Sequence, residues 1–258
     1  MADVRRSLGK FPIVCIAAAL AATVLCAAPA NAQMMADLYP NYFTIQQPGQ
    51  LSAVLFGGGY ISDKYGTTQQ GVQVEQSITP YIGMFARATG YQLWIGHGFD
   101  DPLAPGSGFS RRLNFGRFQG GLDFTLYPGT HLFISGGGDA GDSHAGVVEG
   151  DFSSWLFLHS MHPVNFSFSS MWDSQNGVVS TEIDLQNIVL STEKYMVLLG
   201  GGGAMYQGGF LTASQGQGGP DLGFFYRPWQ MGFSAQAGYG TAHQYGQLSM
   251  YKQFSFSE

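Results

Sequence analysis

The chain has 258 residues, of which 45% are hydrophobic, 14% aromatic and only 11% charged, whereas soluble globular domains carry about 25% charged residues. Its 38 glycines and 11 prolines follow no fixed period, which excludes a collagen-like repeat. The net charge of −6 argues against a nucleic-acid-binding protein, because such proteins need a basic surface. We therefore expect no nucleic-acid partner.

The N-terminal segment has the three parts of a secretory signal peptide. A basic stretch ends at Lys10, an apolar run covers 11–28, and an Ala-x-Ala site ends at Ala32. The apolar run is also close to the length of a single membrane anchor, but its many alanines and the Ala-x-Ala site favour cleavage. Cys15 and Cys26 both lie in this segment, so the exported chain is expected to have neither a disulfide nor a reactive thiol.

After this segment, apolar and polar residues alternate with a period of two. Residues 118–126 place apolar residues or glycine at even positions and polar residues such as Asp123 at odd positions, and 164–169, 229–239 and 248–257 repeat the alternation. No window keeps the helical i, i+3, i+4 spacing, and no apolar run reaches about 18 residues, which excludes a helical membrane protein. Segments of about ten residues with one apolar and one polar face are typical of a transmembrane β-barrel.

A soluble β-sandwich also alternates, and strand length distinguishes the two folds. The predicted strands at 81–95, 112–126, 145–159 and 178–191 each have 14–15 residues, whereas soluble strands usually have about five or six. A tilted membrane-spanning strand needs about nine to eleven. Aromatic residues also mark the strand ends, as interfacial girdles do: Tyr81, Trp94, Tyr127, Trp172, Tyr195, Tyr226 and Trp229. The sequence therefore favours the barrel over the sandwich.

Turn chemistry divides the barrel region into about twelve strands. Short turns are predicted at 79–80, 127–130, 161–163, 192–194 and 227–228, and longer loops rich in Gly, Asp and Gln at 62–67, 96–111, 139–144, 173–177, 208–219 and 240–243. An even strand number puts both chain ends on the side of the short turns, which is the periplasmic side. Glycine runs at 57–59, 136–138 and 200–203 predict bends or close backbone approach near the rim.

In these features the chain resembles Gram-negative outer-membrane β-barrel proteins over residues 33–258. The resemblance is one of architecture and matches no subfamily with an assignable function. It implies surrounding outer-membrane lipids and insertion by the barrel assembly machinery, which reads a C-terminal aromatic residue; here Phe256 lies two residues before the last. The expected organisation is a signal peptide at 1–32, an extended periplasmic segment at 33–50, and an all-β, up-and-down outer-membrane barrel at 51–258.

Motifs for catalysis and for cofactors are weak in this sequence. Residues 136–141 fit G-x-G-x-x-G, but no helix follows to bind a dinucleotide. Asp142 and His144 resemble the Asp-x-His pair of the omptin proteases, yet the adjacent acids at 100–101 lack the two-residue spacing that would place both on one strand face. Asp139 and Asp142 are weak loop candidates for Ca²⁺ that fit no known calcium loop. We expect no enzymatic activity, no cofactor and no metal site.

The charged residues expected to face the lumen give the strongest indication of function. Following the alternation, they are Glu75, Arg87, Arg117, Asp123, Glu149, Asp151, Glu182 and Asp184. Inward charges either line water or pair into a plug, and twelve strands lie between the filled eight-stranded barrels and the open sixteen-stranded porins. The leading hypothesis is a narrow, weakly cation-selective pore for small hydrophilic solutes. The alternatives are a closed structural, adhesive or export-partner barrel and, less favoured, a barrel hydrolase.

Overall fold

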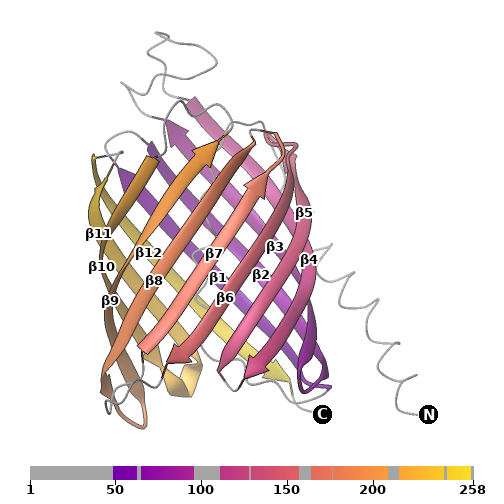
Figure 1. Ribbon diagram of the computed structural model, residues 1–258, viewed down its shortest axis with the longest axis vertical. Coiled ribbons are helices and arrows are strands. Elements are labelled where there is room, and N and C mark those ends of the chain that lie inside the picture. Colours follow the sequence, from indigo (N-terminus) through magenta and orange to yellow (C-terminus); the bar gives the residue numbers. More distant parts are fainter. Residues whose placement is uncertain are drawn as a thin grey trace, which may run out of the picture.

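Twelve antiparallel strands form one closed barrel, in which β1 pairs with β12 (Figure 1). The computed structural model describes residues 49–62, 65–95, 111–127, 129–156, 164–175, 177–208, 215–240 and 243–256. The predicted fold class and strand number are confirmed. The predicted signal peptide and most of the periplasmic segment lie outside the described residues. Within the part of the chain that is described, no helix is both long and apolar enough to cross a membrane.

Each strand is long enough to cross a bilayer, because the shortest, β7 and β11, have 10 residues and the longest, β4, has 17. The strands are β1 (Leu51–Ser62), β2 (Tyr65–Thr79), β3 (Ile82–Ile95), β4 (Arg111–Tyr127), β5 (Thr130–Gly141), β6 (Gly146–Leu156), β7 (Val164–Asp173), β8 (Val178–Ser191), β9 (Tyr195–Gly208), β10 (Gln215–Tyr226), β11 (Met231–Gly240) and β12 (His243–Phe256). A single 3-10 turn, η1 (Arg227–Trp229), joins β10 to β11.

The two-residue period separates an apolar outer face from a more polar inner face. In β12, Leu248 and Met250 are exposed on the outside, whereas Ser249 and Tyr251 are buried inside. Aromatic side chains lie exposed near the two ends of the wall, including Trp94 and Trp172 at one end and Tyr81, Tyr127, Tyr195 and Trp229 at the other. This belt and its aromatic borders match the outer surface of a membrane barrel.

The connections are less asymmetric than the sequence predicts. At the short-turn end, where both described chain ends lie, four connections have two to four residues, but seven residues separate β6 from β7. At the opposite end, called here the loop end, only the 15-residue connection between β3 and β4 is long. Several segments predicted as loops belong to strands instead, since β5 continues to Gly141 and β10 begins at Gln215. Glycine and glutamine occur both in loops and at the inward positions of barrel strands, so these residue types do not distinguish the two.

Apolar side chains gather in the lumen near the short-turn end. We call this group the apolar cluster; it consists of Val54, Phe56, Met196, Leu198, Phe225 and Tyr251, with Trp155 and Ile188 packed against it. The rings of Phe225 and Tyr251 stack with centroids 6.2 Å apart. Phe56 fits there because Gly71 has no side chain: a Cβ at Gly71 would lie 2.4 Å from Cζ of Phe56. Apolar packing therefore occupies part of the lumen at this level.

Candidate functional site

The structure places all eight predicted inward charges on the inner face of the wall. Five of them are between 1% and 4% exposed, namely Glu75, Arg87, Arg117, Asp123 and Glu149, whereas Asp151, Glu182 and Asp184 are partly buried. The eight residues do not form one site. They divide into two arginine-centred ion-pair groups, a carboxylate–histidine group near the short turns, and an acidic group around a cavity.

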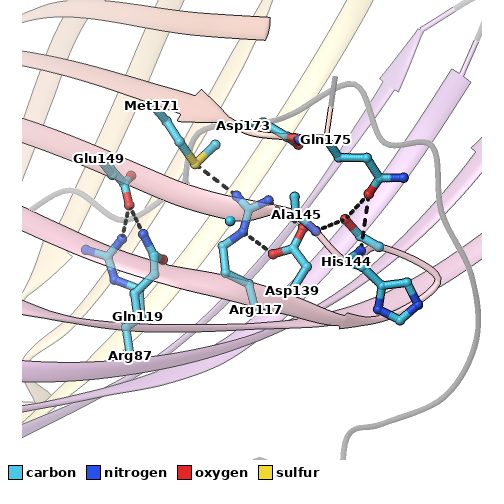
Figure 2. A network of polar contacts seen from close by, with 12 residues as sticks. Arg87, Arg117, Gln119, Asp139, His144, Ala145, Glu149, Met171, Asp173 and Gln175 are labelled. Atoms are coloured by element: carbon cyan, nitrogen blue, oxygen red, sulfur yellow. Dashed lines mark hydrogen bonds and ion pairs between the residues drawn. The ribbon is translucent and has the colours of Figure 1, made fainter. Parts of the chain in front are cut away.

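Arg117 is held by a buried ion pair (Figure 2). Its Nε and Nη2 lie 2.8 and 3.1 Å from the two carboxylate oxygens of Asp139, and Nη1 contacts the sulfur of Met171 at 2.9 Å. Arg117 and Asp139 face each other in the β4–β5 register. The prediction that Asp139 lies in a loop is therefore wrong, because β5 extends past it. A bidentate guanidinium–carboxylate pair neutralises both charges.

Arg87 joins β3 to the two acids of β6. Its Nη1 lies 3.2 Å from Oε2 of Glu149, and its Nη2 lies 3.9 Å from Oδ2 of Asp151. Its Nε donates to Oε1 of Gln73 at 2.9 Å, and Gln119 donates to the same Glu149 oxygen (Figure 2). Two carboxylates thus share one guanidinium, which leaves this group with a formal charge of −1.

Glu75 and Asp123 lie near the short turns together with a histidine that the sequence reasoning missed. Nδ1 of His131 is 3.1 Å from each carboxylate oxygen of Asp123. The Glu75 carboxylate packs over Gly83, where a Cβ would lie 2.9 Å from Oε1. The alternation that identified the other inward residues also places His131 inward, two residues before the buried Phe133.

A polar cavity of about 130 Å³ lies between the arginine groups and β8–β12. Five carboxylates line it, those of Glu149, Asp151, Glu182, Asp184 and Asp221, together with four glutamines, five serines and one guanidinium, that of Arg87. The sequence reasoning missed Asp221 because it took 208–219 as a loop and did not extend the alternation into β10. The cavity has an excess of negative charge.

The glycine run of β9 provides room for this cavity. Gly200 stands between Gln186 and Asp221 in the register, and the Gln186 amide donates to the Asp221 carboxylate across it. A Cβ at Gly202 would lie 2.9 Å from Oδ1 of Asp184 and 3.0 Å from Nε2 of Gln236. The run lies in the middle of the strand and not at the rim, where it was expected. Its close backbone approach agrees with the prediction: a Cβ at Gly200 would lie 1.9 Å from the Leu185 carbonyl oxygen.

The residues considered for protease or calcium chemistry are engaged in structural hydrogen bonds. Oδ2 of Asp142 accepts the backbone N–H of Asn114 at 3.1 Å. The backbone N–H of His144 donates to Oε1 of Gln175 at 3.2 Å (Figure 2). The acids at 100–101 lie outside the described residues. Among the residues that are described, no three His, Cys, Asp or Glu side chains surround one metal position.

Comparisons with known proteins identify the fold. No family model matches the chain, and no curated protein matches it. Its structure is similar to that of an outer-membrane channel from Pseudomonas putida F1, with a TM-score of 0.54 and 10% identity over 85% of this chain and 100% of that chain. The transport unit of the autotransporter AIDA-I from Escherichia coli matches with a TM-score of 0.48 and 10% identity, over 92% of this chain and 97% of that one.

The beta domain of the Bordetella autotransporter BrkA also matches, with a TM-score of 0.48 and 12% identity, over 79% of this chain and 98% of that one. The chain thus has the fold of an outer-membrane β-barrel. At such low identities the likeness concerns the fold and not the activity.

Proposed function

We propose that the protein is a narrow outer-membrane channel for small hydrophilic solutes, with a weak preference for cations. The observation that carries this proposal is the polar cavity, in which five carboxylates face a single guanidinium. The other inward arginine, Arg117, contributes no net positive charge because Asp139 neutralises it. Acidic groups around confined water raise the local concentration of cations and repel anions.

The proposal includes the route by which the chain reaches the membrane. Residues 1–32 direct export and are cleaved, residues 33–50 form an extended periplasmic segment, and the barrel assembly machinery inserts the strands. The described strands begin at Leu51 and end at Phe256, which pair with each other at the short-turn end. That end faces the periplasm in this arrangement.

Ion selectivity in a planar bilayer tests the channel. Across a KCl gradient the native protein should carry a steady current with a reversal potential that favours K⁺. Changing Asp151→Asn, Glu182→Gln and Asp184→Asn together should move the reversal potential towards zero and leave the melting temperature unchanged. Glu193→Gln, an exposed change in the β8–β9 turn, is the control and should leave the potential unchanged. If the triple variant lowers the melting temperature and neither protein conducts, the acids are packing groups and the selectivity mechanism is wrong.

The apolar cluster favours a second candidate function, a closed barrel with a structural or partner-binding role. Its side chains project from β1, β9, β10 and β12 and pack together in the lumen near the short turns. In a channel, the same cluster would be a hydrophobic constriction, which limits conduction by excluding water.

Removing two aromatic rings from the apolar cluster distinguishes these functions. Phe56→Ala combined with Phe225→Ala removes aromatic volume from the constriction, so a channel should show a higher single-channel conductance than the native protein. Each truncation costs about 3–5 kcal/mol of stability, so heat-modifiable gel mobility must first show that the barrel still forms. A folded double variant that stays silent at every voltage, like the native protein, supports the closed barrel.

A further inference from the structure

Three tyrosines lie at the loop-end side of the acidic cavity. Tyr60, Tyr206 and Tyr245 are each at most 5% exposed. The rings of Tyr60 and Tyr245 stack with centroids 5.6 Å apart and an interplanar angle of 17°. The Tyr60 hydroxyl donates to Oε1 of Gln217 at 2.8 Å, and Gln217 lines the cavity. Tyr60 is therefore connected to the cavity by a direct hydrogen bond, and Tyr245 stacks on Tyr60.

The Tyr245 hydroxyl is buried and has no hydrogen-bond partner among the described residues. It lies within electrostatic range of Glu182, Asp184 and Asp221. Its ring packs over Gly238, where a Cβ would lie 2.8 Å from a ring carbon. The described protein leaves this buried hydroxyl without a hydrogen bond, which indicates that a polar group from outside completes it.

The carboxylates lie along the same face as the tyrosines. Glu182 pairs with Ala204, which makes Tyr206 its diagonal neighbour on the inner side of β8 and β9. Asp184 lies one inward position closer to the short turns, and its buried Oδ1 also finds no partner among the residues described. The site therefore presents aromatic rings, tyrosine hydroxyls and carboxylate oxygens, and of these only the hydroxyls have hydrogens to donate.

This arrangement suits an organic ammonium ion better than a metal ion. No three acidic, histidine or cysteine side chains of the described chain converge on one metal position, and β9 separates Asp184 from Asp221. Carboxylates that are spread along a wall match a solute with two or more separated positive charges. Ammonium groups donate N–H bonds to carboxylates and are attracted to the faces of tyrosine rings.

We infer that Glu182, Asp184 and Asp221, with Tyr60, Tyr206 and Tyr245, bind small organic polycations that carry separated ammonium groups, such as aliphatic polyamines. This inference rests on the proposed channel for the route of the solute and specifies the class of solute that the channel selects. The binding itself requires only the folded barrel.

Spermidine is the probe, and two measurements are made on the full barrel. Calorimetric titration of the detergent-solubilised protein reports binding, and planar-bilayer current reports conduction with and without spermidine. Spermidine should bind saturably and interrupt the current, whereas Mg²⁺ at equal ionic strength should do neither. Triethylene glycol, an uncharged chain of comparable length, should also fail to bind.

Two variants within the site and one control variant outside it test which residues bind spermidine. Asp184→Asn with Asp221→Asn should weaken spermidine binding by about tenfold or more, because charge-assisted bonds are lost. Tyr245→Leu should weaken it by about two- to fivefold through the lost ring face. Tyr239→Leu, on the exposed outer face of β11, is the matched control and should bind as the native protein does. Heat-modifiable mobility verifies that each variant is folded.

The outcomes separate this inference from the proposed function. Saturable binding by a barrel that never conducts overturns the channel and supports the polycation site. Conduction without saturable spermidine binding, or with equal binding of Mg²⁺, overturns the site and leaves the channel in place. Binding that the acidic double variant retains in full also overturns it, because the carboxylates are then not the ligands.

Discussion

Arg117 illustrates how a single ion pair neutralises a buried charge inside this barrel. Its side chain is only 1% exposed, and both of its carboxylate-facing nitrogens are matched by Asp139. A buried pair of this kind adds little net stability, but removing one partner leaves an uncompensated charge. Arg117 therefore acts as a structural residue. Because Asp139 neutralises it, Arg117 does not offset the negative charge of the cavity.

Arg117→Met should lower the free energy of unfolding by about 3–5 kcal/mol, because the Asp139 carboxylate then stays buried without its cation. The double variant Arg117→Met with Asp139→Leu should recover most of this loss. Urea unfolding followed by tryptophan fluorescence measures both. Arg112→Met, at an exposed position that bonds Gln92, is the control and should change little. A double variant no more stable than the single one would show that packing, and not charge pairing, sets the cost.

At the scale of elements, the glycine run of β9 shapes the cavity. Gly200 lies between Gln186 and Asp221, Gly202 lies between Asp184 and Gly219, and neither glycine supplies a side chain to the lumen. The neighbouring strands approach closely there, since a Cβ at Gly200 would overlap the Leu185 carbonyl oxygen. The absence of a side chain at Gly200 lets the Gln186 amide reach the Asp221 carboxylate across β9.

Gly200→Ala should destabilise the barrel by about 1–3 kcal/mol or more, because a methyl group 1.9 Å from the Leu185 oxygen forces β8 and β9 apart. Gly136→Ala is the matched control within another glycine run, since its nearest neighbour there is 3.8 Å away. The fraction of heat-modifiable protein after refolding, as a function of temperature, compares the two. Equal melting of both variants would contradict the close approach.

The two-residue period predicted the faces of the strands, and therefore which charges point inward, because parity along a strand leaves no other choice. It did not predict which side chains meet. The Arg117–Asp139 pair depends on the register that the β4–β5 turn sets, and the Arg87–Glu149 contact spans three strands. Asp221 was missed because the glycines and glutamines before it also occur in loops. Sequence alternation specifies the face, whereas register and closure specify the partner.

At the scale of the whole molecule, the lumen is layered along the barrel axis. The apolar cluster and the Glu75, Asp123 and His131 group lie at the short-turn end, the arginine ion pairs and the acidic cavity occupy the middle, and the tyrosines lie towards the loop end. A solute entering from the loop end would meet aromatic faces first, then carboxylates, and finally the apolar constriction. In the proposed channel, the groups that attract cations would thus precede the apolar cluster.

The outer surface provides a test of the membrane location itself. Leu248 lies near the middle of β12 and Leu126 lies beside the exposed Tyr127 at a strand end, and the two are similarly exposed, at 53% and 58%. A lysine on the lipid face costs about 2–4 kcal/mol at the bilayer midplane and about 0–1 kcal/mol near the interface. In lipid vesicles, Leu248→Lys should therefore lower the free energy of unfolding in urea far more than Leu126→Lys does. A barrel that stands in water would lose little at either position, because both side chains would already be solvated. Equal, small effects of the two lysines, or a native chain that stays in solution without detergent, would contradict the membrane location.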